Sequence, residues 1–276
     1  MKKENYIKSR RNIAGINTTL YFFLFCTLLT GSSNLLFARQ NYTITQDDSL
    51  ALEKVIVERY YDAASNDYTD TVPDMLPKGS VTYRIYIDMK PGYSLQAVYG
   101  VKNHELFLKT STVFFNDQVC YAKTGFNIDA KKLHKGAVAL DSWITMGAAS
   151  RLHTGILKSE DDSIFSFVLN RRSFKNVDGL TKGVLPTFQI FNIDLTCFYN
   201  DSTSGIFSTS DGAWAAMGGV KGPTPENRVL IAQLTTNGKL TFALNVQIGT
   251  PSGGVVKFVA KNPEGSEIQF DGLTQN

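Results

Sequence analysis

The stretch RVLIAQLTTNGKLTFALNVQIG, residues 228–249, decides the fold class of this 276-residue chain. It consists of two runs of β-branched and other apolar residues, separated by Asn237-Gly238. Side chains of this kind favour strands. Asn-Gly between two such runs is the strongest short sequence signal for a β-hairpin. The stretch therefore predicts two antiparallel strands joined by a tight turn.

A second hairpin is predicted over residues 80–101, SVTYRIYIDMKPGYSLQAVYGV. Its first run alternates apolar and polar side chains, as a half-buried strand does. Pro91-Gly92 suit the central positions of a type II turn. Similar strand-like runs occur along the rest of the chain: VIVERYY (55–61), HELFLKTSTVFF (104–115), AVALDSWITMG (137–147), SIFSFVL (163–169), PTFQIFNIDLTCFY (186–199), VVKFVA (255–260) and SEIQF (266–270).

The whole chain shows about ten to twelve such runs and no convincing amphipathic helix outside its N-terminus. Many short strands at this spacing are typical of an all-β domain. We predict one antiparallel β-sandwich, jelly-roll-like, over residues 50–276. Residues 39–49 are polar, and we expect them to form a loose leader before it.

The N-terminus has the layout of a secretory signal peptide. A basic region precedes the apolar run 20–29, small polar residues follow, and Ala38 suits a cleavage site. The alternative is an uncleaved membrane anchor, but the apolar run is shorter than the roughly 20 residues that a spanning helix needs. We predict a signal peptide over residues 1–38 and no membrane span after its removal. Three destinations stay open: the medium, the cell surface and the periplasm.

Charge and cysteine content narrow the choice of partner and compartment. Cleavage would remove five of 28 basic and one of 25 acidic residues, which leaves a formal net charge of −1. A nucleic-acid partner calls for a basic protein, so we expect none. Cys120 and Cys197 would remain, and in an exported protein they are candidates for a disulfide. Two buried thiols that pack as small apolar side chains are an equal alternative.

The segment AWAAMGGVKGP, residues 213–223, raises the question of a phosphate-binding loop. A Walker loop needs GxxxxGK followed by Ser or Thr, between a strand and a helix. Here Lys221 precedes Gly222-Pro223 and a further strand, so no helix N-terminus is present to hold an anion. We therefore interpret Gly218 and Gly219 as a bend or bulge in a strand.

Several blocks resemble one known family. They are VERYY (57–61), SVTYRIYIDMKPGYSLQAVYG (80–100), ALDSWITMGAAS (139–150), GAWAAMGGVKGPTPENRVLIAQLTTNGKLTFALNVQIGTPSGG (212–254) and FVAKNPEGSEI (258–268). They look like secreted all-β domains of Bacteroidetes-type bacteria, a family with no established activity. The resemblance touches most of residues 57–270 and implies an exported β domain. It assigns no site residues.

The titratable residues do not form a catalytic motif. His153 with Asp141-Ser142 suggests a Ser-His-Asp set, but the GxSxG nucleophile elbow is missing. We expect His153, His104 and His134 at the surface or in loops. A glycosidase needs two carboxylates across a cleft, and the candidate acids are Glu58, Asp88, Glu105, Asp141 and Asp194. We expect the three aspartates, which lie in strand-like runs, to face solvent on the outer side of a sheet.

Two further features suggest ligands. The acidic segments NDYTD (66–70), with Asp74 nearby, and SEDDS (159–163) offer the oxygen ligands that calcium prefers, but they lack EF-hand spacing. Solvated loops are the simpler interpretation, and we predict no cofactor. A set of tyrosines suggests either a sugar-stacking platform or core packing, and we favour the core: Tyr60, Tyr61, Tyr83, Tyr86, Tyr93 and Tyr99.

These patterns predict an exported, non-catalytic surface, matrix or adhesion protein without catalytic, cofactor-binding or metal-binding residues. A glycan-binding module is the alternative, and a polysaccharide-active enzyme comes third. The expected partner is a glycan, another cell-surface polymer or a second copy of the chain.

Overall fold

The computed structural model describes residues 42–63, 76–162, 178–199 and 202–276. The strand predicted at 163–169 lies outside these ranges. The described chain is all-β, with short 3-10 turns between the strands. Its strand pairs are antiparallel except for the one between β15 (Val255–Val259) and β16 (Ile268–Gln269). The predicted fold class, an antiparallel β-sandwich, is confirmed.

Sheet 1 is one layer of the sandwich. In spatial order it contains β1 (Leu52–Asp62), β2 (Val81–Met89), β12 (Arg228–Thr236) and β5 (Trp143–Ile144). The two long neighbours of β2 pair with it antiparallel along nearly its whole length.

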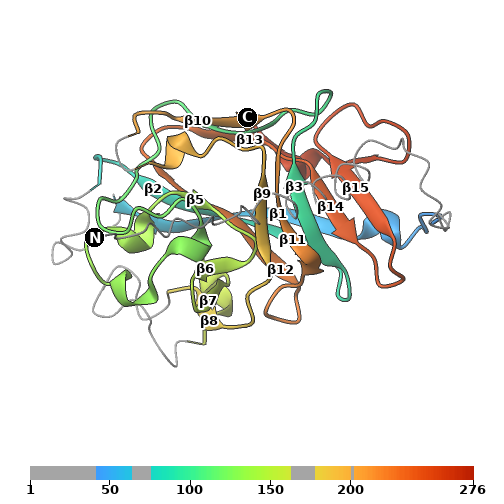
Figure 1. The fold of residues 1–276 in the computed structure, drawn as a ribbon, viewed down its shortest axis with the longest axis horizontal. Helices are drawn as coiled ribbons and strands as arrows, with labels where there is room; N and C mark the ends of the chain where they lie inside the picture. Colours follow the sequence, from blue (N-terminus) through green and yellow to red (C-terminus); the bar gives the residue numbers. More distant parts are fainter. Residues whose placement is uncertain (1–41, 64–75, 163–177, 200–201) are drawn as a thin grey trace, which may run out of the picture. The chain divides into compact units, whose positions relative to one another are not determined.

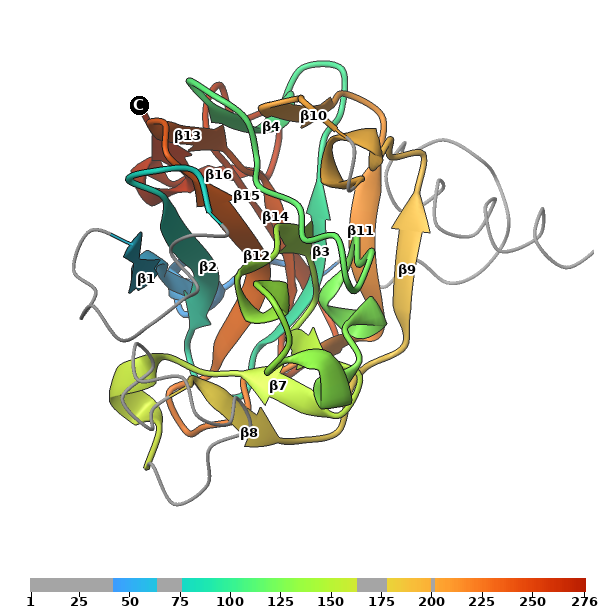
Figure 2. The ribbon, with the colours of Figure 1, turned by 90° about the vertical axis from the view of Figure 1, so that its left-hand side faces the viewer.

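The opposite layer is a long sheet with a bend across it. Sheet 2 contains β16, β15, β14 (Val246–Gly249), β3 (Ser94–Tyr99), β11 (Ala213–Val220) and β9 (Phe188–Phe191). Sheet 3 contains β10 (Ile206–Thr209), β4 (Leu106–Thr110), β13 (Leu240–Ala243) and β17 (Thr274–Gln275). Figure 1 shows β3, β11, β14 and β15 of sheet 2 near one another. In the chain, β3 leads to β4, β10 to β11 and β13 to β14. These strands keep the same order in both sheets (Figure 2). Sheets 2 and 3 are therefore two halves of one bent sheet.

The main core lies between sheet 1 and the bent sheet. Ile85 and Ile87 of β2 meet Val98 of β3, Trp214 of β11 and Leu108 of β4 in one buried cluster. The indole N–H of Trp214 donates to the carbonyl of Thr145 at 3.0 Å, so its one polar atom is satisfied. Burying apolar side chains of this size contributes about 1.5–3 kcal/mol each.

Sheet 1 is buried on its second face as well. A cap formed by residues 115–142, 148–162 and 178–182 covers it and includes sheet 4, which contains β6 (Ala148–Ser150), β7 (His153–Gly155) and β8 (Leu180–Lys182). Tyr86 and Leu230 of sheet 1 pack with Val138, Leu140 and Leu180 of the cap in a second buried cluster. Figure 2 shows sheet 4 at the end of the domain opposite to sheet 3.

The hairpin predicted over residues 80–101 does not form. Pro91-Gly92 makes the expected turn, with the Tyr93 N–H donating to the Lys90 carbonyl at 3.3 Å and Gly92 at a φ of +95°. The flanking strands, however, belong to different layers, because β2 lies in sheet 1 and β3 in sheet 2. The turn therefore carries the chain across the core, where both strands bury apolar side chains from opposite sides.

The hairpin predicted around Asn237-Gly238 is also wrong, since β12 lies in sheet 1 and β13 in sheet 3. A type I′ turn needs a positive φ at both central residues, and neither residue has one. Glycine is needed at position 238 because neighbouring side chains come close to its Cα. A Cβ on Gly238 would lie 2.5 Å from Oγ1 of Thr110 and 2.6 Å from Oγ1 of Thr112.

The expectation of a loose leader is wrong for its described part, residues 42–49. Asp48 is buried and accepts hydrogen bonds from the Tyr42 hydroxyl (2.5 Å), from the N–H and hydroxyl of Thr45 (2.9 and 2.5 Å) and from the Tyr93 hydroxyl (3.0 Å). Burial alone would raise the pKa of Asp48, but these hydrogen bonds outweigh it and lower the pKa to about 2. The carboxylate thus fastens the start of the domain to the turn at residues 90–93.

The two cysteines are not linked in the structure. Cys197 is buried in the main core, whereas Cys120 packs at the margin of the second core. Burial raises the pKa of both thiols, that of Cys197 to about 12. The sequence left open a disulfide and two separate thiols, and the structure has two separate thiols.

Replacing Gly238 tests why glycine is needed between β12 and β13. Gly238→Ala places a methyl group against the threonine hydroxyls, and overpacking of this kind costs about 1–3 kcal/mol. Asn237→Ala, at an ordinary φ, should change the free energy of unfolding by less than about 0.5 kcal/mol. Urea denaturation of both variants measures this. A costly Asn237→Ala would instead indicate the type I′ hairpin.

The Asp48 contacts predict an acid-sensitive contribution to stability. Because the folded-state pKa is depressed, the contribution is present above the unfolded pKa of about 3.9 and is lost as the pH falls towards 2. Asp48→Asn should cost about 2 kcal/mol at pH 7 and little near pH 2. The exposed neighbour variant Asp47→Asn is the control and should cost less at pH 7. Equal losses in both variants would contradict the role of Asp48.

Candidate functional site

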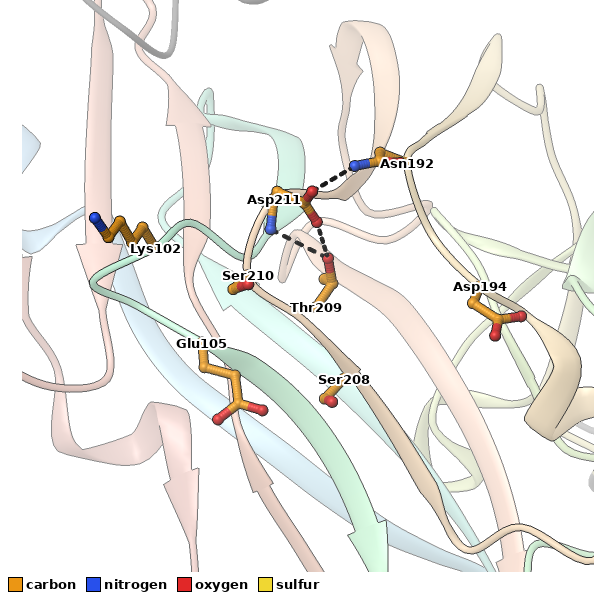
Figure 3. Close-up of a pocket in the computed structure, with 8 residues that line it drawn as sticks. All are labelled: Lys102, Glu105, Asn192, Asp194, Ser208, Thr209, Ser210 and Asp211. Atoms are coloured by element: carbon orange, nitrogen blue, oxygen red, sulfur yellow. Dashed lines mark hydrogen bonds between the residues drawn. The ribbon is translucent and has the colours of Figure 1, made fainter.

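A hollow of about 550 Å³ lies where the bent sheet turns its corner. All of its lining side chains are polar (Figure 3). Three segments supply them: the connection from β3 to β4, the loop after β9, and the end of β10 with the turn into β11. The lining residues are Lys102, Glu105, Asn192, Asp194, Ser208, Thr209, Ser210 and Asp211.

Two glycines let the backbones approach one another at this corner. The Gly100 N–H donates to the Gly212 carbonyl at 2.8 Å. A Cβ on Gly100 would lie 2.0 Å from the carbonyl oxygen of Thr209, and a Cβ on Gly212 would lie 2.4 Å from that of Asn192. Contacts this short exclude any side chain, so glycine at both positions brings the three segments together.

Asp211 organises the rim of the hollow. Its Oδ2 accepts a hydrogen bond from Nδ2 of Asn192 at 2.6 Å, and its Oδ1 accepts a longer one from the Thr209 hydroxyl at 3.4 Å. Asn192 has a φ of +47°, a backbone conformation that asparagine tolerates better than most residues. On the same loop, Asp194 accepts a hydrogen bond from the Thr196 N–H at 2.8 Å, which fixes the carboxylate beside the hollow.

The hollow is open and mainly acidic. Glu105, Asp194 and Asp211 are exposed carboxylates, and Lys102 is the one cation among the lining residues. His104, between Lys102 and Glu105 in sequence, points away into a buried contact, with its Nε2 2.8 Å from Oε2 of Glu267. This site therefore offers many hydrogen-bond acceptors together with amide, hydroxyl and ammonium donors. Such a lining suits a ligand rich in hydroxyl groups.

Of the five acids singled out from the sequence, Glu105 and Asp194 come together at the hollow. The others lie around sheet 1 and its cap. Glu58 is half-buried, and its Oε1 accepts a hydrogen bond from the Lys158 N–H at 2.7 Å. Asp88 is buried, with its Oδ2 3.2 Å from Nε of Arg228. The expectation that Asp88 faces solvent is wrong, because the cap covers that face of sheet 1.

Asp141 is also buried, contrary to expectation. Its Oδ1 accepts hydrogen bonds from the N–H groups of Asp117 (2.8 Å) and Ser142 (3.0 Å). Burial raises the pKa of the Asp141 carboxyl well above its ordinary value, the nearby Asp117 carboxylate adds to this, and the two N–H groups oppose it. The residue holds the cap together and does not reach the hollow. Asp194 is exposed, as expected, although it lies in a loop and not in a strand.

The histidines do not assemble a catalytic set with Asp141 and Ser142. His134 is exposed, as expected, but His104 and His153 are buried, so the prediction of a surface position is wrong for these two. Nδ1 of His153 lies 2.8 Å from the hydroxyl of Ser150, which is itself fully buried. Burial lowers the pKa of His153.

The interpretation of Gly218 and Gly219 as a bulge is confirmed. Ala215 of β11 pairs with Ala97 of β3, and the next pair is Val220 with Leu95, so β11 holds extra residues between the two pairs. Gly218 and Gly219 have φ values of +79° and +78°. The tyrosine set packs in the core as favoured: Tyr60, Tyr61, Tyr86, Tyr93 and Tyr99 are buried and Tyr83 is half-buried.

The candidate calcium segments gain no further support. NDYTD and Asp74 lie outside the described residues. In SEDDS, Glu160 forms an ion pair with Arg228, and Oδ2 of Asp161 accepts a hydrogen bond from the Gly179 N–H at 2.8 Å. Within the four described ranges, no group of three or more acidic, histidine or cysteine side chains is arranged to hold a metal ion.

Sequence patterns missed most of the hollow. Asn192, Lys102 and the run 208–211 carry no motif, since isolated polar residues in turns are common. The sequence does offer one signal, which is glycine at positions 100 and 212. Gly100 directly follows a strand-like run, and Gly212 directly precedes one. Such glycines mark close backbone approaches.

Comparisons of the chain with protein-family models, with curated proteins and with solved structures found no match. In the part of the chain that the structure describes, no helix is long and apolar enough to cross a membrane.

The raised pKa of Asp141 predicts that stability falls as the pH rises. The folded protein binds this proton more tightly than the unfolded chain, so the stabilisation is full below about pH 3.9 and is lost as the pH rises through the folded-state pKa. Asp141→Asn keeps the site neutral and should be more stable than the parent at pH 8, with the two within about 0.5 kcal/mol at pH 4. Urea titrations across this range check it. Asp271→Asn, at an exposed carboxylate, serves as the control, and an Asp141→Asn variant less stable at pH 8 would contradict the prediction.

Proposed function

We propose that this protein is an exported, non-catalytic component that holds a hydroxyl-rich polymer, such as a cell-surface glycan, in the corner hollow. The lining carries the proposal: eight polar side chains from three separate segments converge on one open site. Carboxylates and side-chain amides can bind neighbouring hydroxyl groups in pairs, because each offers two polar atoms side by side. A sugar presents such pairs of hydroxyl groups.

The openness of the hollow favours a polymer over a small ligand. Each exposed side chain exchanges a hydrogen bond to water for one to the ligand, so each contact adds only about 0.5–1.5 kcal/mol. A polymer offers the same group many times, and a surface that carries many copies of the protein binds it with avidity. A surface, matrix or adhesion role is consistent with this mode of binding.

Export is supported by the sequence pattern of residues 1–38, with its basic region, apolar run and Ala38. The medium, the cell surface and the periplasm all contain polysaccharide, so each of the three destinations is compatible with the proposed ligand.

A polysaccharide-active enzyme is the second candidate, because Glu105 and Asp194 line the same hollow. Two carboxylates are the minimum set for glycoside hydrolysis. Against this candidate, both side chains are exposed, whereas a glycosidase keeps its acid protonated by an apolar environment. Binding without turnover is the better interpretation.

The proposal is tested by screening purified protein on a glycan array and by titration calorimetry with a retained polysaccharide. Asn192→Ala and Asp211→Ala should each weaken binding about tenfold, as expected for the loss of hydrogen bonds that involve a charged group. Asp271→Ala removes an exposed carboxylate elsewhere and should leave the affinity unchanged. Thermal unfolding of each variant shows whether the rim has lost its structure.

Two outcomes would contradict the proposal. Retention of no glycan at all would leave the hollow without the proposed ligand. Release of reducing ends that disappears in Asp194→Asn or Glu105→Gln would establish the enzyme in its place.

A further inference from the structure

Two tyrosines stand out from the other aromatic residues by their exposure. Tyr121 is 61% exposed and Tyr199 39% exposed, and they are the exposed aromatic side chains in the four described ranges. All other phenylalanine, tyrosine and tryptophan rings in those ranges are buried or half-buried. These two rings therefore contribute less to either core than the rest, and part of each ring is available to a ligand.

The two tyrosines belong to one part of the surface. Nζ of Lys123 lies 3.5 Å from the centre of the Tyr199 ring, and Lys123 follows Tyr121 by two residues. The chain segments behind them are joined as well, because Nδ2 of Asn116 donates to the Cys197 carbonyl at 3.1 Å.

A lysine-rich turn adjoins the same segment. Nζ of Lys132 donates to the Val119 carbonyl at 3.2 Å, and Lys131 and Lys135 are exposed on either side of it in sequence. In the described structure, none of Lys123, Lys131, Lys132 and Lys135 forms an ion pair with a carboxylate. Together with Tyr121 and Tyr199, these four lysines make up the tyrosine–lysine surface.

Two carboxylates, those of Asp117 and Asp129, belong to the same chain segment as these lysines. Asp117 is buried and accepts hydrogen bonds from the backbone N–H groups of Val119 (2.7 Å) and Ala137 (3.1 Å). Asp129 is half-buried and accepts from the Lys131 N–H at 3.0 Å, as the cap of a short 3-10 turn. Both carboxylates keep their negative charge, but they are less exposed than Lys131 and Lys135, and the four lysines outnumber them.

The backbone at Tyr121 is strained. Its φ of +54° lies in the left-handed region, which suits glycine or asparagine and costs a bulky residue on the order of 1–2 kcal/mol. A ring that is mostly in solvent recovers little of this cost by packing. Packing therefore does not offset the strain at Tyr121, and this makes the residue one to test for contact with a ligand.

We propose that the tyrosine–lysine surface binds an acidic polysaccharide. The flat rings stack on the apolar faces of sugar units, and the four ammonium groups attract carboxylate or sulfate groups along the polymer. The site is separate from the corner hollow, whose three carboxylates would repel such a polymer. Polysaccharide is favoured over nucleic acid because residues 1–38 carry an export pattern.

The experiment measures binding of fluorescently labelled polygalacturonate to protein purified after expression of the full chain, by fluorescence anisotropy. The affinity should fall steeply as the salt concentration rises from about 0.05 M to about 0.5 M, because exposed charges are screened. The double variant Lys131→Gln/Lys135→Gln should bind about tenfold more weakly, and Tyr199→Ala about fivefold. The matched control is Lys54→Gln/Lys239→Gln, which removes two exposed lysines elsewhere and should stay within about twofold.

Tyr121→Gly separates a binding role from a structural one. Glycine removes the ring and relieves the left-handed strain, so the variant should lose about fivefold in affinity without any fall in thermal stability. A fall in stability with unchanged affinity would show that the ring serves the fold, and would overturn the assignment of Tyr121.

Three other results would overturn the proposal as a whole. They are no binding to polygalacturonate at about 0.05 M salt, where attraction is strongest, an equal loss in the control pair, and tighter binding to single-stranded DNA of matched charge. Glycan binding at the hollow does not depend on these lysines, so failure here leaves the Asn192 and Asp211 variants as an independent test.

Discussion

The side chain of Asn245 holds the corner at which the long sheet bends, and the rest of the structure depends on that bend. Asn245 is buried between β13 and β14, where its Nδ2 donates to the carbonyls of Tyr99 (3.1 Å) and His104 (3.0 Å). Its Oδ1 accepts from the Ala260 N–H at 3.2 Å. One amide thus closes the excursion between β3 and β4 and ties it to the strand beyond β14. A buried amide with several satisfied bonds is costly to replace, and this makes the corner a fixed feature of the fold.

The hollow is a consequence of that corner. The connection from β3 to β4 and the turn from β10 into β11 both leave the sheet at this corner. Together they enclose a space that neither connection would form alone. Gly100 and Gly212 allow the contact, and Asp211 with Asn192 sets the rim. The fold therefore supplies a rigid frame, and the polar residues of the connections supply the chemistry. This is the usual division between a scaffold and the loops that it positions.

The second constraint is the burial of sheet 1 on both faces. Arg84 is fully buried between this sheet and the cap, where its Nε donates to Gln233 Oε1 at 2.8 Å and its Nη1 to the Gly179 carbonyl at 2.9 Å. Its guanidinium lies 3.6 Å from the centre of the Tyr60 ring. A buried cation is tolerated only with such partners. The cap must therefore remain in place for sheet 1 to be stable, and it also carries most of the tyrosine–lysine surface.

The all-β class could be predicted from the sequence, because runs such as residues 81–89 alternate apolar and polar side chains. This alternation indicates a strand with one face in a core. The sequence could not predict how the strands pair, since a turn such as Pro91-Gly92 serves equally well within a sheet and between two layers. It misplaced Asp88, because an alternating strand looks the same whether its polar face meets water or a polar cap. It misplaced Asp141 because the strand predicted over residues 137–147 is mostly absent: residues 138–140 form a 3-10 turn of the cap, and the strand there is only Trp143–Ile144. Glu105 and Asp194 could be proposed as site residues because they are carboxylates. Their meeting at one hollow depends on contacts between distant segments, which no local pattern records.

The corner hollow is tested most directly by a nuclear magnetic resonance titration of isotope-labelled protein with an oligosaccharide cut from a polysaccharide that it retains. We expect the backbone amide shifts to be concentrated in the three segments around Lys102–Glu105, Asn192–Asp194 and Ser208–Asp211. Saturable binding with shifts confined to other parts of the surface would contradict the claim that the bend of the long sheet creates the binding site.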